Sequence, residues 1–360
     1  MELSLCMIVK NEEARLGRCL ESVRDAVDEI VILDTGSTDA TKAVAARYTD
    51  KIYDYVWQDD FSDARNRSFS YATKPFILWL DADDVLDEEP ARRLSALRAE
   101  LHDGVDAVML PYHYAFGPDG KPSLVFERER IVRRAAGFSF SGVVHEVMAV
   151  GGHVIRRAIP VRHTGRHGEQ SNRRNLAIYE AWMARGRAMS ARDRYYYARE
   201  LMSAGELERA EQAFLAFLDM DGWLPDRIDA RIQRGECLMR LGNTAEARRS
   251  LLGALETGVP RAEALCALGA CFLQEGDLHA AAHWYRAALL CAMPENPSTF
   301  TLPDAYGYVP LMQLCMILSR LGDDVEASRM NEQALLLHPG DAAALANRAY
   351  FTARLAETGN

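Results

Sequence analysis

Short apolar runs alternate with amphipathic segments over the first 80 residues of this chain. The apolar runs are LSLCMIV, EIVILD, KIYDYVW and FILWL, and the segments between them cover residues 14–27, 39–48 and 62–73. This order predicts a parallel sheet with right-handed crossovers, because a helix must return the chain between two parallel strands. Strands that are apolar throughout are typical of a sheet covered by helices on both faces. We therefore expect an N-terminal α/β domain.

A different pattern begins near residue 190, where strand-like runs stop and alanine and leucine become common. Glycines recur at positions 205, 242, 276 and 322, and the fifth residue after each glycine is an alanine. This spacing resembles the tetratricopeptide repeat, in which a turn glycine joins two antiparallel helices and small residues let the helices approach closely. We expect an α/β domain over 1–190 and an all-α repeat solenoid over 191–360.

Composition excludes several classes of protein. The chain has 360 residues and a formal net charge of −10, and no concentrated basic face that would bind nucleic acid. No apolar run reaches the length of a membrane span, and the start of the chain lacks the basic residues of a signal peptide. The seven cysteines are scattered without a CxxC pair. We expect a cytoplasmic protein with reduced cysteines and no membrane span.

Three carboxylates follow the fourth apolar run directly, at Asp81, Asp83 and Asp84. Ligands of an open parallel sheet bind outside the carboxyl ends of its strands, and Asp81 and Asp83 would share a direction if the extended geometry continues. Converging carboxylates repel each other, and a divalent cation relieves that repulsion. A nucleoside diphosphate is a natural second partner for such a cation. The alternative is that Asp83 and Asp84 only begin a turn before a helix near residue 90.

Polar residues also follow the other three runs. Lys10, Asn11 and Glu12 follow the first, Asp34 ends the second, and Arg65 lies in FSDARN after the third. Together, MIVKNEE, VILDTGSTD, FSDARN and LWLDADD resemble the nucleotide-sugar-binding half of family 2 glycosyltransferases with the Rossmann-like GT-A fold. The resemblance implies that Lys10, Asn11, Glu12 and Asp34 form a pocket for the base and ribose. It places Arg65 at the diphosphate or the base. Asp34 could instead cap the following helix.

The resemblance also implies a metal site and a reaction. Asp81 and Asp83 match the DxD motif of the family, with Asp83 as the direct ligand of Mn or Mg and Asp81 shared between ribose and metal. The cation would offset diphosphate charge as the sugar departs. The donor would be a nucleoside diphosphate sugar, with a UDP-sugar favoured, and transfer would invert the anomeric centre. An ion pair of Arg65 with Asp59 or Asp63 is the plainer alternative for that arginine.

Such a displacement needs a base for the acceptor's proton. GFSFSGVVHE, followed by the strand-like VIRRAIPVRH, resembles a branch of the family with an F-x-G-x-VHE element and a later histidine. On that resemblance, Glu146 or Asp84 is the base, and His163 or His145 is a third metal ligand, since imidazole binds Mn. The basic run FERERIVRR could contact diphosphate or acceptor, but we expect a solvated edge strand there.

The repeats bear on the acceptor. Several members of this family that append tetratricopeptide repeats glycosylate peptides, including cysteine or serine side chains of ribosomal peptide antibiotics. The resemblance therefore implies a peptide or protein acceptor, held by the concave solenoid. Other members with a VHE element act on lipopolysaccharide core or cell-envelope glycans, which is the alternative. The repeats could also form a homodimer surface. A non-catalytic repeat scaffold is the hypothesis from another class.

Overall fold

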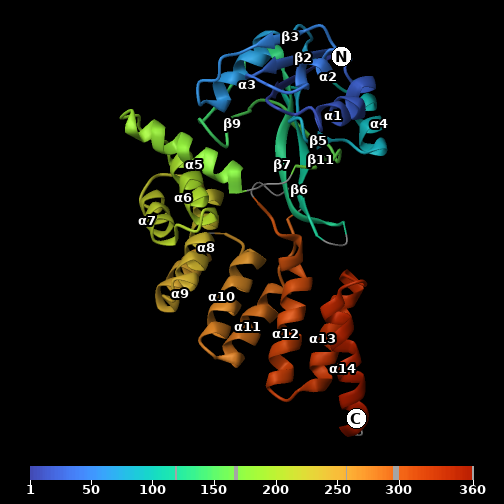
Figure 1. Ribbon diagram of the computed structural model, residues 1–360. Helices are drawn as coiled ribbons and strands as arrows, with labels where there is room; N and C mark the ends of the chain where they lie inside the picture. Colours follow the sequence, from blue (N-terminus) through green and yellow to red (C-terminus); the bar gives the residue numbers. More distant parts are fainter. Residues whose placement is uncertain (118–119, 166–168, 257, 295–299, 359–360) are drawn as a thin grey trace. The chain divides into compact units, whose positions relative to one another are not determined.

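The computed structural model describes residues 1–117, 120–165, 169–256, 258–294 and 300–358 (Figure 1). The chain divides into two compact units. The first comprises Met1–Ala115 and Val125–Asp193, and the second comprises Phe116–Leu124 and Arg194–Asn360. Each unit has its own hydrophobic core.

A mixed sheet forms the centre of the first unit, and nine strands belong to it among the described residues. Eight of them lie in the order β3-β2-β1-β4-β7-β6-β11-β5, and β10 pairs with β6. The predicted parallel strands are β1 (Leu3–Val9), β2 (Glu29–Asp34), β3 (Ile52–Asp54) and β4 (Phe76–Trp79). The others are β5 (Asp84–Val85), β6 (Ala107–Phe116), β7 (Pro122–Arg133), β10 (Val154–Arg156) and β11 (Val161–His163).

Residues 126–133 of the basic run FERERIVRR lie in β7, which is not an edge strand. β7 lies between β4 and β6 and runs antiparallel to β4. Arg130 is fully buried, and its guanidinium pairs with Asp84 at 3.0 Å. The prediction of a solvated edge strand was therefore wrong. Its basic residues suggested solvent because the run itself does not show that a buried carboxylate lies opposite Arg130.

Helices cover both faces of the sheet, as the apolar strands predicted. One face packs against α1 (Leu16–Val23), α2 (Thr41–Ala45) and α4 (Glu88–Leu97). The other face packs against α3 (Phe61–Ser70) and a two-stranded sheet of β8 (Phe140–Ser141) and β9 (Val147–Met148). Alternate residues of a strand point to opposite faces, so Leu5 and Met7 join the first layer and Cys6 the second. The unit also contains α5 (Glu169–Ala184) and the short 3₁₀ helices η1 (Arg24–Ala26) and η2 (Arg134–Ala136).

The second unit is a stack of helix pairs (Figure 1). All four predicted turn glycines have φ between +81° and +87°, a left-handed conformation that glycine adopts without a side-chain clash. The four alanines at the fifth residue after them are fully buried. The repeat prediction is therefore confirmed. The helices are α6 (Ala191–Ser203), α7 (Leu207–Leu218), α8 (Leu224–Arg240), α9 (Thr244–Gly253), α10 (Ala262–Gln274), α11 (Leu278–Ala288), η3 (Pro303–Tyr306), α12 (Tyr308–Arg320), α13 (Asp324–Leu337) and α14 (Ala342–Thr358).

None of the helices in the described part of the chain is both long enough and apolar enough to span a membrane.

Candidate active site

The turns after β1 and β2 are joined by hydrogen bonds from Asn11. Its backbone N–H donates to Ser37 Oγ at 2.9 Å, and its side-chain oxygen accepts from the Thr38 N–H at 2.8 Å. Asn11 has φ +56°, a left-handed conformation that asparagine tolerates better than most residues. Lys10 beside it is exposed, and Glu12 is half-buried. The predicted base-pocket residues therefore come together at the carboxyl ends of neighbouring strands.

Asp34 lies at the end of β2 with only 1% of its surface exposed. Its Oδ1 accepts hydrogen bonds from the N–H groups of Gly36 at 3.0 Å and Ser37 at 2.8 Å. Its Oδ2 is buried and has no hydrogen-bond partner among the described residues. A buried acceptor without a donor costs about 1–3 kcal/mol, and more when it is charged. The second oxygen of Asp34 is thus suited to receive a hydrogen bond from a ligand.

Arg65 of α3 joins the DxD motif to the VHE element. Its Nη2 donates to Asp81 Oδ1 at 2.6 Å, and its Nε donates to Glu146 Oε1. The guanidinium is buried and lies over the indole of Trp79, 4.6 Å from the ring centroid. Burial alone would raise the pKa of Asp81, but the charges of Arg65, Arg130 and Arg128 and the hydrogen bond from Arg65 together outweigh it and lower that pKa to about 2. The structure thus pairs Arg65 with carboxylates distant in sequence, in place of Asp59 or Asp63.

Asp84 begins β5 and is completely buried. Its Oδ1 accepts from the Tyr112 hydroxyl at 2.8 Å, and its Oδ2 accepts from the Asp81 N–H at 3.0 Å. Arg130 Nη2 lies 3.0 Å from the same Oδ2. Both carboxylate oxygens of Asp84 therefore already have donors within the fold.

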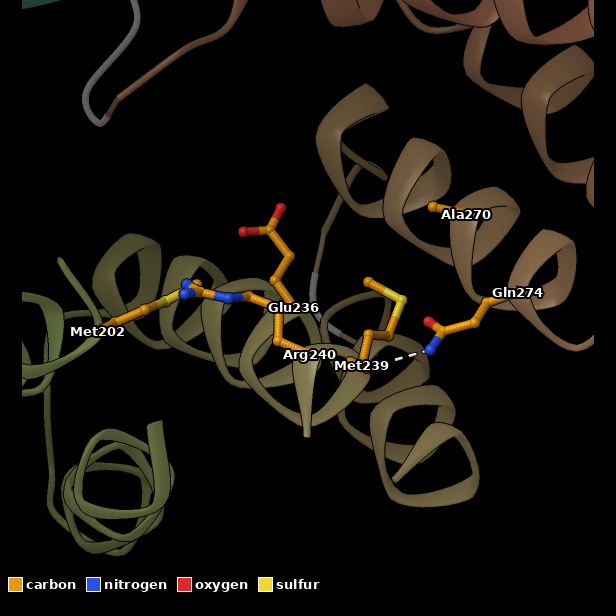
Figure 2. Close-up of a pocket in the computed structure, with 6 residues that line it drawn as sticks. All are labelled: Met202, Glu236, Met239, Arg240, Ala270 and Gln274. Atoms are coloured by element: carbon orange, nitrogen blue, oxygen red, sulfur yellow. Dashed lines mark hydrogen bonds between the residues drawn. The ribbon is translucent and has the colours of Figure 1, made fainter. Parts of the chain in front are cut away.

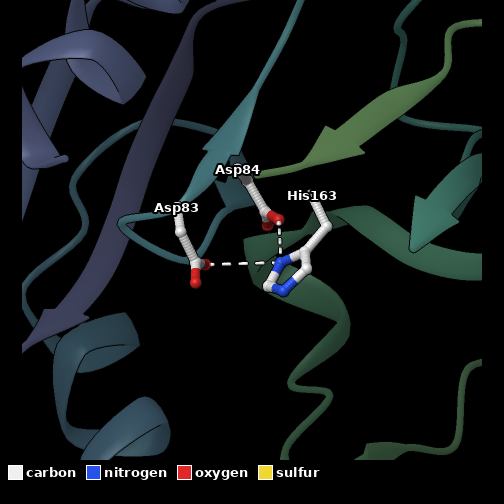
Figure 3. A group of neighbouring side chains, drawn as sticks. All are labelled: Asp83, Asp84 and His163. Carbon is white, nitrogen blue, oxygen red and sulfur yellow. Dashed lines mark ion pairs between the residues drawn. The ribbon is translucent and has the colours of Figure 1, made fainter. Parts of the chain in front are cut away.

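Asp83, Asp84 and His163 form a group with metal-ligating atoms that all lie within 4.8 Å of one another (Figure 3). His163 Nδ1 is 3.5 Å from Asp83 Oδ1 and 3.6 Å from Asp84 Oδ1. Burial raises the pKa of Asp83 to about 6, against the opposing charge of His163. The backbone pairs β11 with β5 in antiparallel register, His163 opposite Asp84, which brings the histidine to the carboxylates. Asp81, predicted as a metal residue, lies outside this group.

Gly165 borders the same group. A Cβ atom at this position would overlap Asp83 Oδ2 and would lie 2.8 Å from His163 Nε2. Only glycine therefore leaves room beside these two potential ligand atoms. A carboxylate oxygen and an imidazole nitrogen are suitable ligands for a divalent cation, and the glycine leaves space beside them.

The VHE element is held in a fixed loop. The Phe61 N–H donates to the Val143 carbonyl at 3.0 Å, and the Tyr179 hydroxyl donates to the Val144 carbonyl at 3.2 Å. His145 has φ +52° and is half-buried, whereas Glu146 is buried against Arg65. His145 is not part of the metal-capable group found among the described residues.

Sequence reasoning missed Tyr112 and Gly165 entirely. It also missed the role of Trp79. The guanidinium carbons of Arg65, Arg128 and Arg130 lie 4.6, 4.7 and 4.1 Å from the centroid of its ring. Such contacts stabilise the buried cations through the electron-rich ring face. The available signal was the pair of arginines in FERERIVRR, two residues apart and hence on one face of a strand.

The repeat unit carries a separate pocket of about 660 Å³ (Figure 2). It lies between first helices of successive repeats, and its lining residues are Met202, Glu236, Met239, Arg240, Ala270 and Gln274. Burial, with the charge of Asp229, raises the pKa of Glu236 to about 7. The pocket therefore combines thioether side chains with one carboxyl group of raised pKa.

Each of the two units matches a known protein family. Residues 4–159 match glycosyl transferase family 2, and residues 198–258 and 238–298 match the tetratricopeptide repeat. A TPR repeat-containing protein of Synechococcus elongatus is 32% identical over 308 residues, covering 80% of this chain and 66% of that protein.

Two similar proteins are named as glycosyltransferases. The SPbeta prophage-derived glycosyltransferase SunS of Bacillus subtilis is 30% identical over 207 residues, covering 54% of this chain and 48% of SunS. The lipopolysaccharide core biosynthesis glycosyltransferase LpsC of Rhizobium meliloti is 32% identical over 163 residues, covering 43% of this chain and 59% of LpsC. This chain thus spans from about half to two thirds of the length of these relatives. It carries a glycosyl transferase family 2 domain of the GT-A fold, followed by tetratricopeptide repeats.

Proposed function

We propose that this chain is a metal-dependent inverting glycosyltransferase that takes its sugar from a nucleoside diphosphate sugar, with a UDP-sugar favoured. One observation carries the proposal. Asp34 Oδ2, which has no hydrogen-bond partner among the described residues, lies at the end of β2, and the metal-capable Asp83 and His163 lie just after β4 and at the end of β11 of the same sheet. In a non-catalytic scaffold the first unit would serve only as a spacer, and a spacer needs no hydrogen-bond acceptors or metal ligands at its strand ends.

The nucleoside would bind at the turns after β1 and β2. Asp34 Oδ2 would accept a hydrogen bond from the base or a ribose hydroxyl, a donor that the described residues do not supply to this buried oxygen. Lys10, Asn11 and Glu12 would border the base, with Asn11 keeping the two turns in register.

Asp83 and His163 would hold the cation, and Asp81 would lie toward the ribose. The charges of Asp81 and Asp84 are already balanced by Arg65 and Arg130, so Asp83 contributes the carboxylate charge. A site with one imidazole ligand favours Mn over Mg, which prefers oxygen ligands. When bound, the cation supplies Lewis-acid stabilisation of the departing diphosphate.

Glu146 is the better of the two predicted bases. Asp84 is completely buried, and both of its oxygens accept hydrogen bonds or an ion pair. Glu146 binds Arg65 through Oε1, and no hydrogen bond to its Oε2 occurs within the described residues. That oxygen would take the proton of the acceptor, while Arg65 holds the carboxylate in place. We propose that His145 maintains the conformation of the loop that carries Glu146.

The acceptor is proposed to be a peptide or protein side chain, held by the repeats. The pocket of Figure 2 supports this, because its thioethers and Glu236 suit a side chain that is both apolar and polar. A cell-envelope glycan is the second candidate, since LpsC is named for lipopolysaccharide core biosynthesis. Homodimer formation and a cytoplasmic location stay predictions.

Hydrolysis of UDP-, GDP- and dTDP-sugars by the full chain tests the donor half of the proposal. We expect one donor to be consumed with Mn, less with Mg, and not with EDTA. Asp83→Asn should abolish consumption, whereas Asp87→Asn, an exposed aspartate near the same turn, should not. If no donor is consumed or bound under any condition, the enzymatic proposal is wrong and the scaffold hypothesis takes its place.

The acceptor half needs a separate assay. With the donor known, a peptide mixture and a lipopolysaccharide core oligosaccharide would be offered in parallel, and transfer would be followed by mass spectrometry. Sugar on peptide alone supports the repeats as the acceptor holder. Sugar on the oligosaccharide alone would favour the second candidate.

A further inference from the structure

We infer that Tyr112 and Asp84 hold the proton of His163 on Nδ1, so that His163 Nε2 and Asp83 Oδ2 are the cation-binding pair, with Gly165 keeping the space beside them open. This inference rests on the proposed function, because it concerns the metal site of that reaction. It makes Asp84 and Tyr112 positioning residues, which act through His163.

The direction of the hydrogen bonds follows from Asp84. This carboxylate pairs with Arg130 at 3.0 Å and accepts the Asp81 N–H at 3.0 Å, so its oxygens act as acceptors. The Tyr112 hydroxyl, 2.8 Å from Asp84 Oδ1, must therefore donate its single proton to Asp84. Its oxygen is then an acceptor toward His163.

His163 supplies the matching donor. Its Nδ1 lies 3.0 Å from the Tyr112 hydroxyl oxygen, so the Nδ1–H donates to that oxygen. Two carboxylate oxygens lie near the same nitrogen, at 3.5 Å on Asp83 and 3.6 Å on Asp84. Three oxygens around Nδ1 favour a proton there and disfavour a cation-binding lone pair. In neutral imidazole the lone pair is then on Nε2.

The imidazole ring is also held in place by packing. Tyr114 stacks on His163 with ring centroids 5.1 Å apart and an interplanar angle of 14°. Tyr112 contacts the same ring edge-on, at 5.9 Å between centroids. These two neighbours restrict rotation of the ring, so the two nitrogens keep their separate environments.

Gly165 lies where Nε2 and the second oxygen of Asp83 meet. The Thr164 N–H and hydroxyl both donate to the Asp83 carbonyl at 2.8 Å, which fixes this short segment against the DxD turn. A side chain on Gly165 would overlap Asp83 Oδ2 and crowd His163 Nε2. Asp83 thus offers Oδ1 to the protonated nitrogen and Oδ2 to the side where Nε2 has its lone pair.

The first experiment measures the tautomer without any metal. Long-range ¹H–¹⁵N spectra of the full chain, recorded at alkaline pH, distinguish a proton on Nδ1 from one on Nε2. The His163 signal is assigned by its loss in His163→Gln. We expect the Nδ1–H tautomer in the wild type and a mixture of both tautomers in Tyr112→Phe. An Nε2–H tautomer in the wild type would overturn the inference.

The second experiment measures Mn²⁺ binding by electron paramagnetic resonance, with Mn²⁺ alone and with Mn²⁺ and UDP. Tyr112→Phe should weaken Mn²⁺ binding about tenfold, since loss of an orienting partner costs about 10–100-fold in metal affinity. Gly165→Ala should abolish binding. Gly151→Ala is the matched control, because a Cβ there would meet nothing within 4 Å. Melting curves identify any variant that fails to fold.

The outcomes separate this inference from the proposed function. If wild-type protein and Gly165→Ala bind Mn²⁺ equally, the cation pair is wrong while the metal-dependent reaction stands. If the wild type consumes a donor sugar but binds no Mn²⁺, the metal part of the proposed function fails and the inference fails with it. Loss of Mn²⁺ binding in Gly165→Ala but not in Gly151→Ala, with the Nδ1–H tautomer in the wild type, supports the inference.

Discussion

Replacing Arg65 with methionine should destabilise the first unit strongly. Arg65 is the buried cation between Asp81 and Glu146, and its side chain and that of Glu146 are 8% and 9% exposed. Methionine keeps much of the side-chain volume but leaves Glu146 buried without its partner. Removing one member of a buried ion pair costs about 3–5 kcal/mol, and the lost stacking on Trp79 adds to that cost.

Hydrogen exchange followed by mass spectrometry is the suitable assay, because a chain of two units need not unfold in a single transition. A loss of about 3–5 kcal/mol corresponds to exchange at least about a hundredfold faster for amides of β1 and β4. Arg67→Met, on the exposed side of the same helix, is the control and should exchange like the wild type. The double variant Arg65→Met/Glu146→Gln should recover part of the loss. Exchange in Arg65→Met within about tenfold of the wild type would refute this reasoning.

Three further predictions concern other parts of the chain. Asp34→Asn should weaken UDP binding, measured by calorimetry, by about 10–100-fold, because a hydrogen bond to a charged group is worth about 1.5–3 kcal/mol. The melting temperature should change little. An unchanged affinity for UDP would exclude Asp34 from the nucleotide site. Burial acts to raise the pKa of Glu29, but hydrogen bonds from Lys51, Ser4 and Thr73 lower it from 4.5 to about 2. The stabilisation of the folded state by the Glu29 carboxylate is therefore complete above pH 4.5 and is lost as the pH falls toward 2. Glu29→Gln should make the melting temperature less dependent on pH over that range. An unaltered pH dependence would contradict the pairing of Glu29 with these donors. Gly322→Ala should destabilise the repeat unit by about 1 kcal/mol in urea denaturation, since φ at this position is +87°, whereas Gly340→Ala, where a Cβ meets nothing within 4 Å, should not.

The strands of the first half could be predicted because their signal is local. LSLCMIV and EIVILD coincide with β1 and β2, since a strand buried on both faces is apolar at most of its positions. The repeats were predictable for a similar reason. A left-handed turn between two helices requires a glycine, and a close helix contact requires an alanine, wherever the rest of the chain lies.

The candidate site was predictable only in part. The positions of Asp34 and Asp83 followed from strand ends, because the carboxyl ends of parallel strands meet at one edge of a sheet. The antiparallel placement of β7 beside β4 did not follow, because the charges of FERERIVRR do not reveal a buried partner. The basic run therefore suggested solvent, and the structure placed Arg130 in the interior.

By itself, the sequence determined the two kinds of domain, the strand ends that carry carboxylates, and the turns of the repeats, because each depends on residues near one another in the chain. Only the tertiary structure decided the partners of those carboxylates. Arg65 reaches Glu146 across 81 positions, and Tyr112 reaches His163 across 51. Ionic and hydrogen-bond partners are chosen by distance in space and by burial, so which carboxylate remains available to a ligand is a property of the folded protein.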